Sequence, residues 1–266
     1  MSGSPPPARR VCVFARVCGP GRLPVGLCGR GHAIGAPPGE QKPVFAAVDP
    51  AVLEQAGIRV EPFGEQDEIV IRRQMGHRPR LAIGVARRCR YGYPQVELFA
   101  PLLADERRIS PNSTLLWLSC PLLVRAVDRL EKEGELERFE HLAAVDGELR
   151  QALEQAHRAT AGIRRLLLPE QWEQKLARER PREHWVITAT GIAGITRPDH
   201  IKCLHAHLAD HLARGANPVG SEVARHLEQL GTPVAGSDTC WRFCTPEGTS
   251  QRWENSDPAS LAGRDP

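Results

Sequence analysis

Strand-like and helix-like patterns occupy separate parts of this sequence. Short apolar stretches with partial alternation predict three β-strands at residues 81–87, 95–101 and 113–120, and the sequence CRYGYP supplies a turn between the first two. From Pro121 to Gly231 the apolar residues recur mainly at helical spacing. This order predicts an α+β fold, in which a small antiparallel three-stranded sheet is followed by a mostly helical C-terminal part.

Proline and glycine residues indicate where helices begin and end in the helical part of the chain. We predict helices at residues 121–133, 146–168, 169–180, 200–214 and 217–230. Pro121 suits the first turn of its helix, Pro169 ends the long second helix, and Gly215 ends the fourth. Asp199 is expected to cap that fourth helix, which follows a loop with two glycines.

The two ends of the chain differ in composition from the middle. Residues 1–60 are rich in Gly, Pro, Arg and Ala, which predicts either a poorly ordered extension or an upstream reading frame that is not normally translated. Residues 66–230 are expected to form a single folded domain. Residues 231–266, rich in Ser, Asp, Pro and Gly, are expected to form a disordered tail.

The apolar residues are not arranged as membrane insertion or secretion requires. No run approaches the roughly 18 apolar residues of a membrane-spanning helix, and Gly and Pro interrupt the N-terminal region where a signal peptide needs an apolar core. We therefore expect a cytoplasmic protein without a membrane partner. Its eight cysteines are widely spread, which favours reduced thiols or metal ligands over a disulfide framework.

Cysteines and histidines in the middle of the chain form a candidate metal site. Strand ends of one sheet can converge with a helix packed on it, and Cys203 and His207 are about 40° apart around their predicted helix. We predict zinc or another thiophilic metal, bound by Cys89, Cys120, Cys203 and His207, with His205 as a substitute ligand. In that helix His205 lies about 160° from Cys203, so the two can meet only if the helix begins late.

Two alternatives to a metal site stay open. No Cys-x-x-Cys pair is present, so the three middle cysteines can be buried structural residues, His205 can be a core residue, and the other histidines can lie on a solvated helix face. Cys203 can instead be a reactive thiol with a nearby histidine as its base. The pair Cys240 and Cys244 near the C-terminus is interpreted as incidental.

Seven arginines between Ile69 and Val96 form a strip without any intervening acidic residue or lysine. They are Arg72, Arg73, Arg78, Arg80, Arg87, Arg88 and Arg90. Guanidinium groups bind phosphates and carboxylates in a bidentate manner, which predicts an anion site for a phosphorylated ligand or, more weakly, for nucleic acid. The alternative is that a GC-rich genome favours arginine codons and the strands place these side chains outward. The net charge of +3 is too small to decide between these two interpretations.

Several motifs together resemble a bacterial family known as domain of unknown function 501. The matching pieces are RRQMGHRPR, VARRCRYGYPQV, TLLWLSCPLLVRAVDRLE, TGIAGI and IKCLHAHLADHLARGANPVG. The last piece is the most specific, because a Lys-Cys-Leu-His block followed by Asn-Pro-Val-Gly is uncommon. The family has no established activity, so the resemblance implies a shared fold and no reaction.

Two functions compete on these observations. The first is a binding or regulatory protein that uses the arginine strip and, where present, a Cys/His metal site. The alternative is a metal- or thiol-dependent enzyme whose site gathers Cys89, Cys120, Cys203, His205 and His207. The acidic residues offer no catalytic pair, because we expect Glu131, Glu133, Glu135 and Glu137 to lie on a solvated helix face. A weaker third hypothesis is an interaction scaffold built on the long helix near residues 149–167.

Overall fold

A computed structural model of the chain describes residues 41–105 and 107–245, all of which belong to one compact unit that begins at Gly39. In these residues no helix combines the length and apolar character needed to cross a membrane. The extension and tail predicted at the two ends therefore lie largely outside the described residues. So do three cysteines, Cys12, Cys18 and Cys28.

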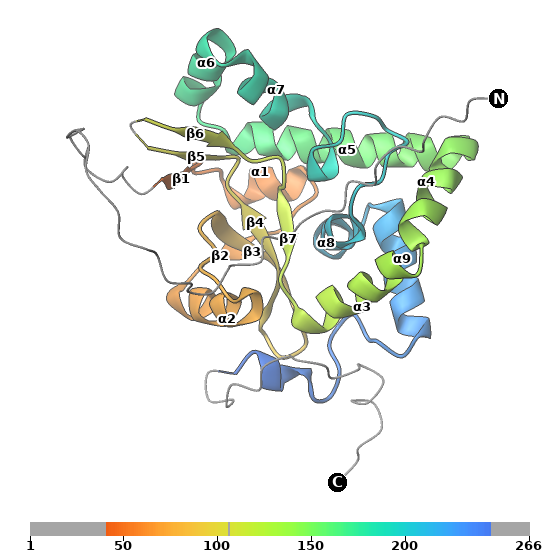
Figure 1. The fold of residues 1–266 in the computed structure, drawn as a ribbon. Coiled ribbons are helices and arrows are strands. Elements are labelled where there is room, and N and C mark those ends of the chain that lie inside the picture. The colour runs from red at the N-terminus through yellow and green to blue at the C-terminus, as the bar shows by residue number, and fades with distance from the viewer. Residues whose placement is uncertain (1–40, 106, 246–266) are drawn as a thin grey trace, which may run out of the picture. The chain divides into compact units, whose positions relative to one another are not determined.

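The described strands form two antiparallel sheets (Figure 1). Four strands make the larger sheet, in the order β2-β3-β4-β7, and three make the smaller one, in the order β1-β5-β6. In chain order the strands are β1 (Lys42–Val44), β2 (Glu61–Pro62), β3 (Ala82–Arg88), β4 (Pro94–Phe99), β5 (Leu102–Ala104), β6 (Ile109–Pro111) and β7 (Leu116–Leu118).

The predicted three-stranded antiparallel sheet is confirmed as β3, β4 and β7. Val96 in β4 lies opposite Arg87 on one side and Leu118 on the other. The sequence pattern missed the β5–β6 hairpin that lies between β4 and β7, because strands of three residues are too short to show alternation. Strand β2 pairs with β3 at the edge of the larger sheet.

The helices surround these sheets. In chain order they are α1 (Pro50–Gln55), α2 (Glu65–Met75), α3 (Pro121–Lys132), α4 (Glu135–Val145), α5 (Gly147–Leu167), α6 (Glu170–Glu179), α7 (Pro181–Ala189), α8 (Leu204–Arg214) and α9 (Pro218–Gln229), with short 3-10 turns η1 (Ile192–Gly194) and η2 (Cys240–Phe243). The predicted helices at α3, α5, α6 and α9 are confirmed within a few residues.

Helices α2, α4 and α7 were not predicted, and α8 begins later than predicted. Pro181 ends α6 as predicted, but it also occupies the first turn of α7, a position that suits proline because no backbone N–H is needed there. Helix α8 begins at Leu204 rather than His200, because Cys203 has extended backbone angles (φ −158°, ψ 117°). Asp199 does not cap it and instead binds Arg197 at 2.8 Å.

Helix α8 lies between strand β7 and helix α9 (Figure 1). Leu204 and Leu208 of this helix and the preceding Ile201 are fully buried in the main core. Burying one such side chain contributes roughly 1.5–3 kcal/mol. The start of α8 is therefore fixed by apolar packing, and the polar residues on either side of Leu204 take their positions from it.

The sequence Asn-Pro-Val-Gly forms the tight corner between α8 and α9. Asn217 caps α9 by accepting a hydrogen bond from Gly220 N at 2.8 Å, and its amide donates to Asp210 at 3.0 Å. A Cβ atom on Gly220 would lie 2.1 Å from the carbonyl oxygen of His207. Only glycine at this position allows the two helices to approach so closely.

Ordered structure extends beyond the predicted domain of residues 66–230 at both ends. Upstream, β1, α1 and β2 are formed, and Ile58 is 1 % exposed in the main core. Downstream, Val234, Cys240 and Phe243 pack against the same core. The chain from residue 41 to residue 245 therefore contributes to one body.

Candidate functional site

Three potential metal ligands of different kinds meet between the end of α3 and the start of α8. They are a carboxylate oxygen of Glu131, the thiol of Cys203 and an imidazole nitrogen of His205, and all three atoms lie within 4.8 Å of one another. Cys203 Sγ is 3.7 Å from His205 Nδ1, which is itself 3.3 Å from Glu131 Oε1. Each of the three residues is half-buried, so the cluster is reachable from solvent.

Local backbone structure explains why these side chains converge. The extended Cys203 precedes the first turn of α8, so its thiol is not held to the helical spacing that would separate it from His205. Leu204 between them is fully buried and fixes the register. Glu131, from the last turn of α3, accepts a hydrogen bond from the Leu204 backbone N–H at 2.7 Å and thereby caps α8.

The second nitrogen of His205 is also held. Nε2 lies 3.1 Å from the carbonyl oxygen of Val124 and 3.4 Å from Asp128 Oδ1. Burial opposes protonation of this imidazole, but its hydrogen bonds with Asp128, Cys203 and Glu131 outweigh burial and raise the pKa of His205 to about 12. Without a metal this imidazole is therefore a cation at neutral pH, paired with two carboxylates, and a metal ion at Nδ1 would take the place of its proton.

The predicted four-ligand set is not brought together in one place. Of those four residues, only Cys203 is in the cluster, and His205, the substitute ligand, is the histidine that it meets. Cys89 and Cys120 line a different small pocket. His207 is fully buried, with Nδ1 3.2 Å from Asn217 Oδ1. The late start of α8 releases the Cys203 side chain from the helical spacing to His207, and Cys89 and Cys120 line a pocket formed with the C-terminal segment.

Glu131 was misinterpreted as part of a solvated face. A usable signal was present, because Glu131 follows the fully buried Val127 by four residues and directly follows the buried Leu130. A residue in that position borders the apolar stripe of α3. Its carboxylate can therefore turn toward a neighbouring helix.

The arginine strip is partly neutralised by carboxylates from other elements. Arg78 binds Glu68 at 2.9 Å, and Arg90 binds Asp238 at 2.6 Å. Arg80 donates to the carbonyl oxygen of Gln41 at 3.0 Å. Arg72 and Arg73 lie in the last turn of α2, where cations suit the helix dipole. A phosphate bound along this strip would have to compete with these contacts.

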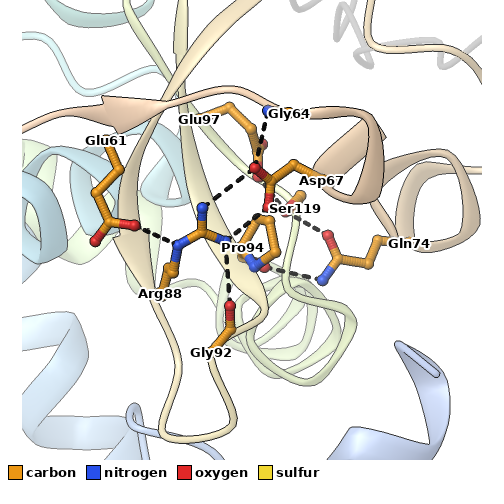
Figure 2. Close-up of polar contacts among 9 residues, drawn as sticks. All are labelled: Glu61, Gly64, Asp67, Gln74, Arg88, Gly92, Pro94, Glu97 and Ser119. Carbon is orange, nitrogen blue, oxygen red and sulfur yellow. Dashed lines mark hydrogen bonds and ion pairs between the residues drawn. The ribbon is translucent and has the colours of Figure 1, made fainter. Parts of the chain in front are cut away.

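Arg88 is the most firmly held arginine of the strip (Figure 2). Its guanidinium binds Asp67 at 2.7 Å and Glu61 at 2.5 Å, and it also donates to the carbonyl oxygen of Gly92. Burial opposes ionisation of Asp67, but hydrogen bonds from Arg88 and from Gly64 N–H outweigh burial and lower its pKa. This pair joins α2 to the sheet.

Next to this pair lies a buried carboxyl group that sequence reasoning did not identify (Figure 2). Glu97, in the middle of β4, is fully buried. Its Oε1 is 2.6 Å from Ser119 Oγ, which is also 2.7 Å from Gln74 Oε1. The Gln74 amide is oriented by donating to the Pro94 carbonyl oxygen at 2.9 Å and to Cys244 Sγ at 3.3 Å.

These contacts indicate a proton on Glu97. Ser119 has one hydroxyl hydrogen, which it gives to the acceptor oxygen of Gln74, so the hydrogen shared with Glu97 must come from the carboxyl group. Burial raises the pKa of Glu97 to about 8, and the negative charge of Asp67 adds to this effect. Glu97 is therefore a neutral acid in a chain of hydrogen bonds that reaches Cys244.

Two neutral histidines form a third polar region inside the helical half. His157 and His207 are in edge contact, with ring centroids 5.9 Å apart. His157 Nδ1 accepts from Ile192 N–H at 3.3 Å, so its proton is on Nε2, whereas His207 Nδ1 faces the acceptor oxygen of Asn217. Burial, with the neighbouring His207, lowers the pKa of His157 to about 4.

Comparison with known proteins yields one match. Residues 85–225, which are just over half of the chain, match the family model described as Protein of unknown function (DUF501). No curated protein and no solved structure matches significantly. The matched region contains Glu131, Cys203 and His205, but neither Cys240 nor Cys244. On this match, the chain belongs to the DUF501 family of proteins of unknown function.

Proposed function

We propose that this chain is a metal-binding protein in which Glu131, Cys203 and His205 hold one thiophilic divalent ion such as zinc. The observation that carries the proposal is the separation of the ligand atoms. Bonds of about 2.0–2.3 Å in a tetrahedral site put neighbouring ligand atoms roughly 3.3–3.6 Å apart. The observed 3.3 Å between His205 and Glu131, and 3.7 Å between Cys203 and His205, are close to these values.

The surroundings support an accessible site rather than a closed structural one. Three protein ligands leave a fourth position for water or a substrate group, as in catalytic zinc sites. Asp128, beside His205 Nε2, is suited to orient the imidazole, because a carboxylate commonly accepts the remaining N–H of a metal-bound histidine. Such a site can polarise a carbonyl or phosphoryl oxygen or activate a water molecule.

A second candidate function uses the same thiol without a metal. Cys203 lies at the N-terminus of α8, 3.7 Å from His205 Nδ1, and Asp128 lies behind the other imidazole nitrogen. This arrangement favours a nucleophilic cysteine that attacks an electrophilic carbon or sulfur atom.

Metal analysis of the purified full-length chain separates these functions. Replacement of Cys203 by Ser or of Glu131 by Gln is expected to remove one equivalent of zinc, whereas His200→Ala, in an exposed neighbouring histidine, is expected to remove none. Unchanged zinc content in both ligand variants would refute the proposal. A nucleophilic Cys203 would instead react quickly with iodoacetamide in metal-free protein, and His205→Gln would slow that reaction.

A further inference from the structure

Four cysteines from three distant parts of the chain line one small pocket at the end of the larger sheet. Cys89 directly follows β3, Cys120 is at the N-cap position of α3, Cys240 begins the short turn η2, and Cys244 follows that turn. Cys120, Cys240 and Cys244 are buried, and Cys89 is half-buried. No thiol in this pocket belongs to the site at Cys203.

The thiols are close enough to interact electrostatically. Burial raises the pKa of Cys120 to about 12, and proximity to Cys244 and Cys240 adds to this. Burial likewise raises the pKa of Cys244 to about 11, with contributions from Cys89 and Cys240. No three of the four sulfur atoms lie within 4.8 Å of one another, so shared ligation requires these side chains to move closer together.

Burial opposes negative sulfur in this pocket, but three neighbouring groups favour it. Gln74 Nε2 donates to Cys244 Sγ at 3.3 Å, a contact that strengthens when the sulfur is a thiolate. Arg73 favours the charged form of Cys244, and Arg90 favours that of Cys240. Two nearby guanidinium groups partly offset the net charge of −2 that four thiolates around one divalent ion would carry.

The C-terminal segment is already held beside the pocket by contacts that do not involve sulfur. Arg90 N–H donates to the Ala235 carbonyl oxygen at 2.9 Å. Gln95 Nε2 donates to the Val234 carbonyl oxygen at 2.8 Å, and Tyr91 Oη donates to that of Ser237 at 3.0 Å. These bonds position η2 against the turn between β3 and β4. A bound ion would therefore have to order little additional chain.

We propose that Cys89, Cys120, Cys240 and Cys244 form a second, structural zinc site that fastens the C-terminal segment to the sheet. Four S–H groups each lose a proton to solvent, and four zinc–sulfur bonds form to one Zn²⁺ ion. Four protein ligands close the coordination sphere, as in structural zinc sites. Two of the four ligands, Cys240 and Cys244, lie beyond the matched family region.

Cobalt(II) titration of the full-length chain tests this proposal, because the intensity of sulfur-to-cobalt charge-transfer absorbance rises with the number of thiolates. All variants carry Cys203→Ser, which removes metal binding at the first site. One equivalent of cobalt with a four-thiolate spectrum is expected, and the double replacement Cys240→Ser and Cys244→Ser should abolish it. Replacing Cys12, Cys18 and Cys28 by Ser together is the matched control and should leave the spectrum unchanged.

A conservative variant covers the case in which the double replacement fails to fold. Cys244→His keeps a zinc ligand, so it should still bind one equivalent of cobalt, with charge-transfer absorbance reduced by about one quarter. Loss of the spectrum only in the control variant would overturn the proposal. Binding that persists without Cys240 and Cys244, or no cobalt binding in the Cys203→Ser background, would overturn it as well.

Discussion

Replacing Glu97 by glutamine is expected to stabilise the fold at neutral pH. The folded state keeps this carboxyl protonated, with a pKa of about 8 against an ordinary value of 4.5, so between these values the folded state binds more protons than the unfolded state. Stability from this group is therefore present at acid pH and is lost as pH rises through the window. Glutamine removes the proton requirement and still offers an N–H to Ser119.

The magnitude follows from the two pKa values. At pH 7 the unfolded carboxylate is about 2.5 pH units above its pKa, while the folded carboxyl is still mostly protonated. At about 1.4 kcal/mol per unit, keeping Glu97 protonated in the folded state lowers the free energy of unfolding by about 3 kcal/mol. At pH 5 the same reasoning gives less than about 1 kcal/mol. The advantage of Glu97→Gln over the natural chain should grow between pH 5 and pH 8.

Urea unfolding at pH 5, 7 and 8 measures this difference directly. Glu137→Gln, in an exposed glutamate of α4, is the matched control and should show almost no change in stability at any of these pH values. A stabilisation by Glu97→Gln that is equal at pH 5 and pH 8 would refute the reasoning. It would mean that Glu97 carries no extra proton in the folded state.

Three further predictions concern other parts of the fold. Gly220→Ala should destabilise the protein by about 1–3 kcal/mol in thermal unfolding, because its Cβ would collide with a carbonyl of α8, whereas Gly162→Ala, with open space around it, should not destabilise. His157 has its pKa lowered to about 4, so stability should fall by about 2 kcal/mol from pH 7 to pH 5, and His157→Phe should reduce this slope in urea unfolding. Binding to single-stranded nucleic acid through the arginine strip stays a prediction; Arg72→Ala with Arg87→Ala should weaken it and flatten its salt dependence.

The sequence was most informative where one residue acts through its own backbone. Pro121 marks the start of α3 and Gly215 the end of α8, as expected from fixed φ in proline and from the left-handed conformation of glycine. The order of strands before helices likewise predicted the fold class correctly. These features depend on local geometry, which a single sequence records.

The sites were harder to predict because they depend on packing between distant segments. Whether Cys203 meets His205 or His207 depends on whether α8 begins at His200 or at Leu204. The burial of Ile201 and Leu204 fixes the start at Leu204. Cys240 and Cys244 looked incidental because nothing local links them to Cys89. Long-range hydrogen bonds from Tyr91, in the β3–β4 turn, and from Gln95, in β4, hold the C-terminal segment near Cys89.

Gln74 connects the protonated carboxyl of Glu97 with the four-thiol pocket. Its amide donates to Cys244 and its oxygen accepts from Ser119, which in turn accepts the proton of Glu97. If zinc makes Cys244 a thiolate, the Gln74 N–H bond strengthens and each following hydrogen bond is polarised in the same direction. Zinc should then raise the pKa of Glu97 further. Urea unfolding with and without zinc, in the Cys203→Ser variant and in the same variant carrying Glu97→Gln, measures this, because the thiol protons released by zinc are common to both. A zinc-dependent change in pH dependence that is equal in the two variants would show that the two sites are independent.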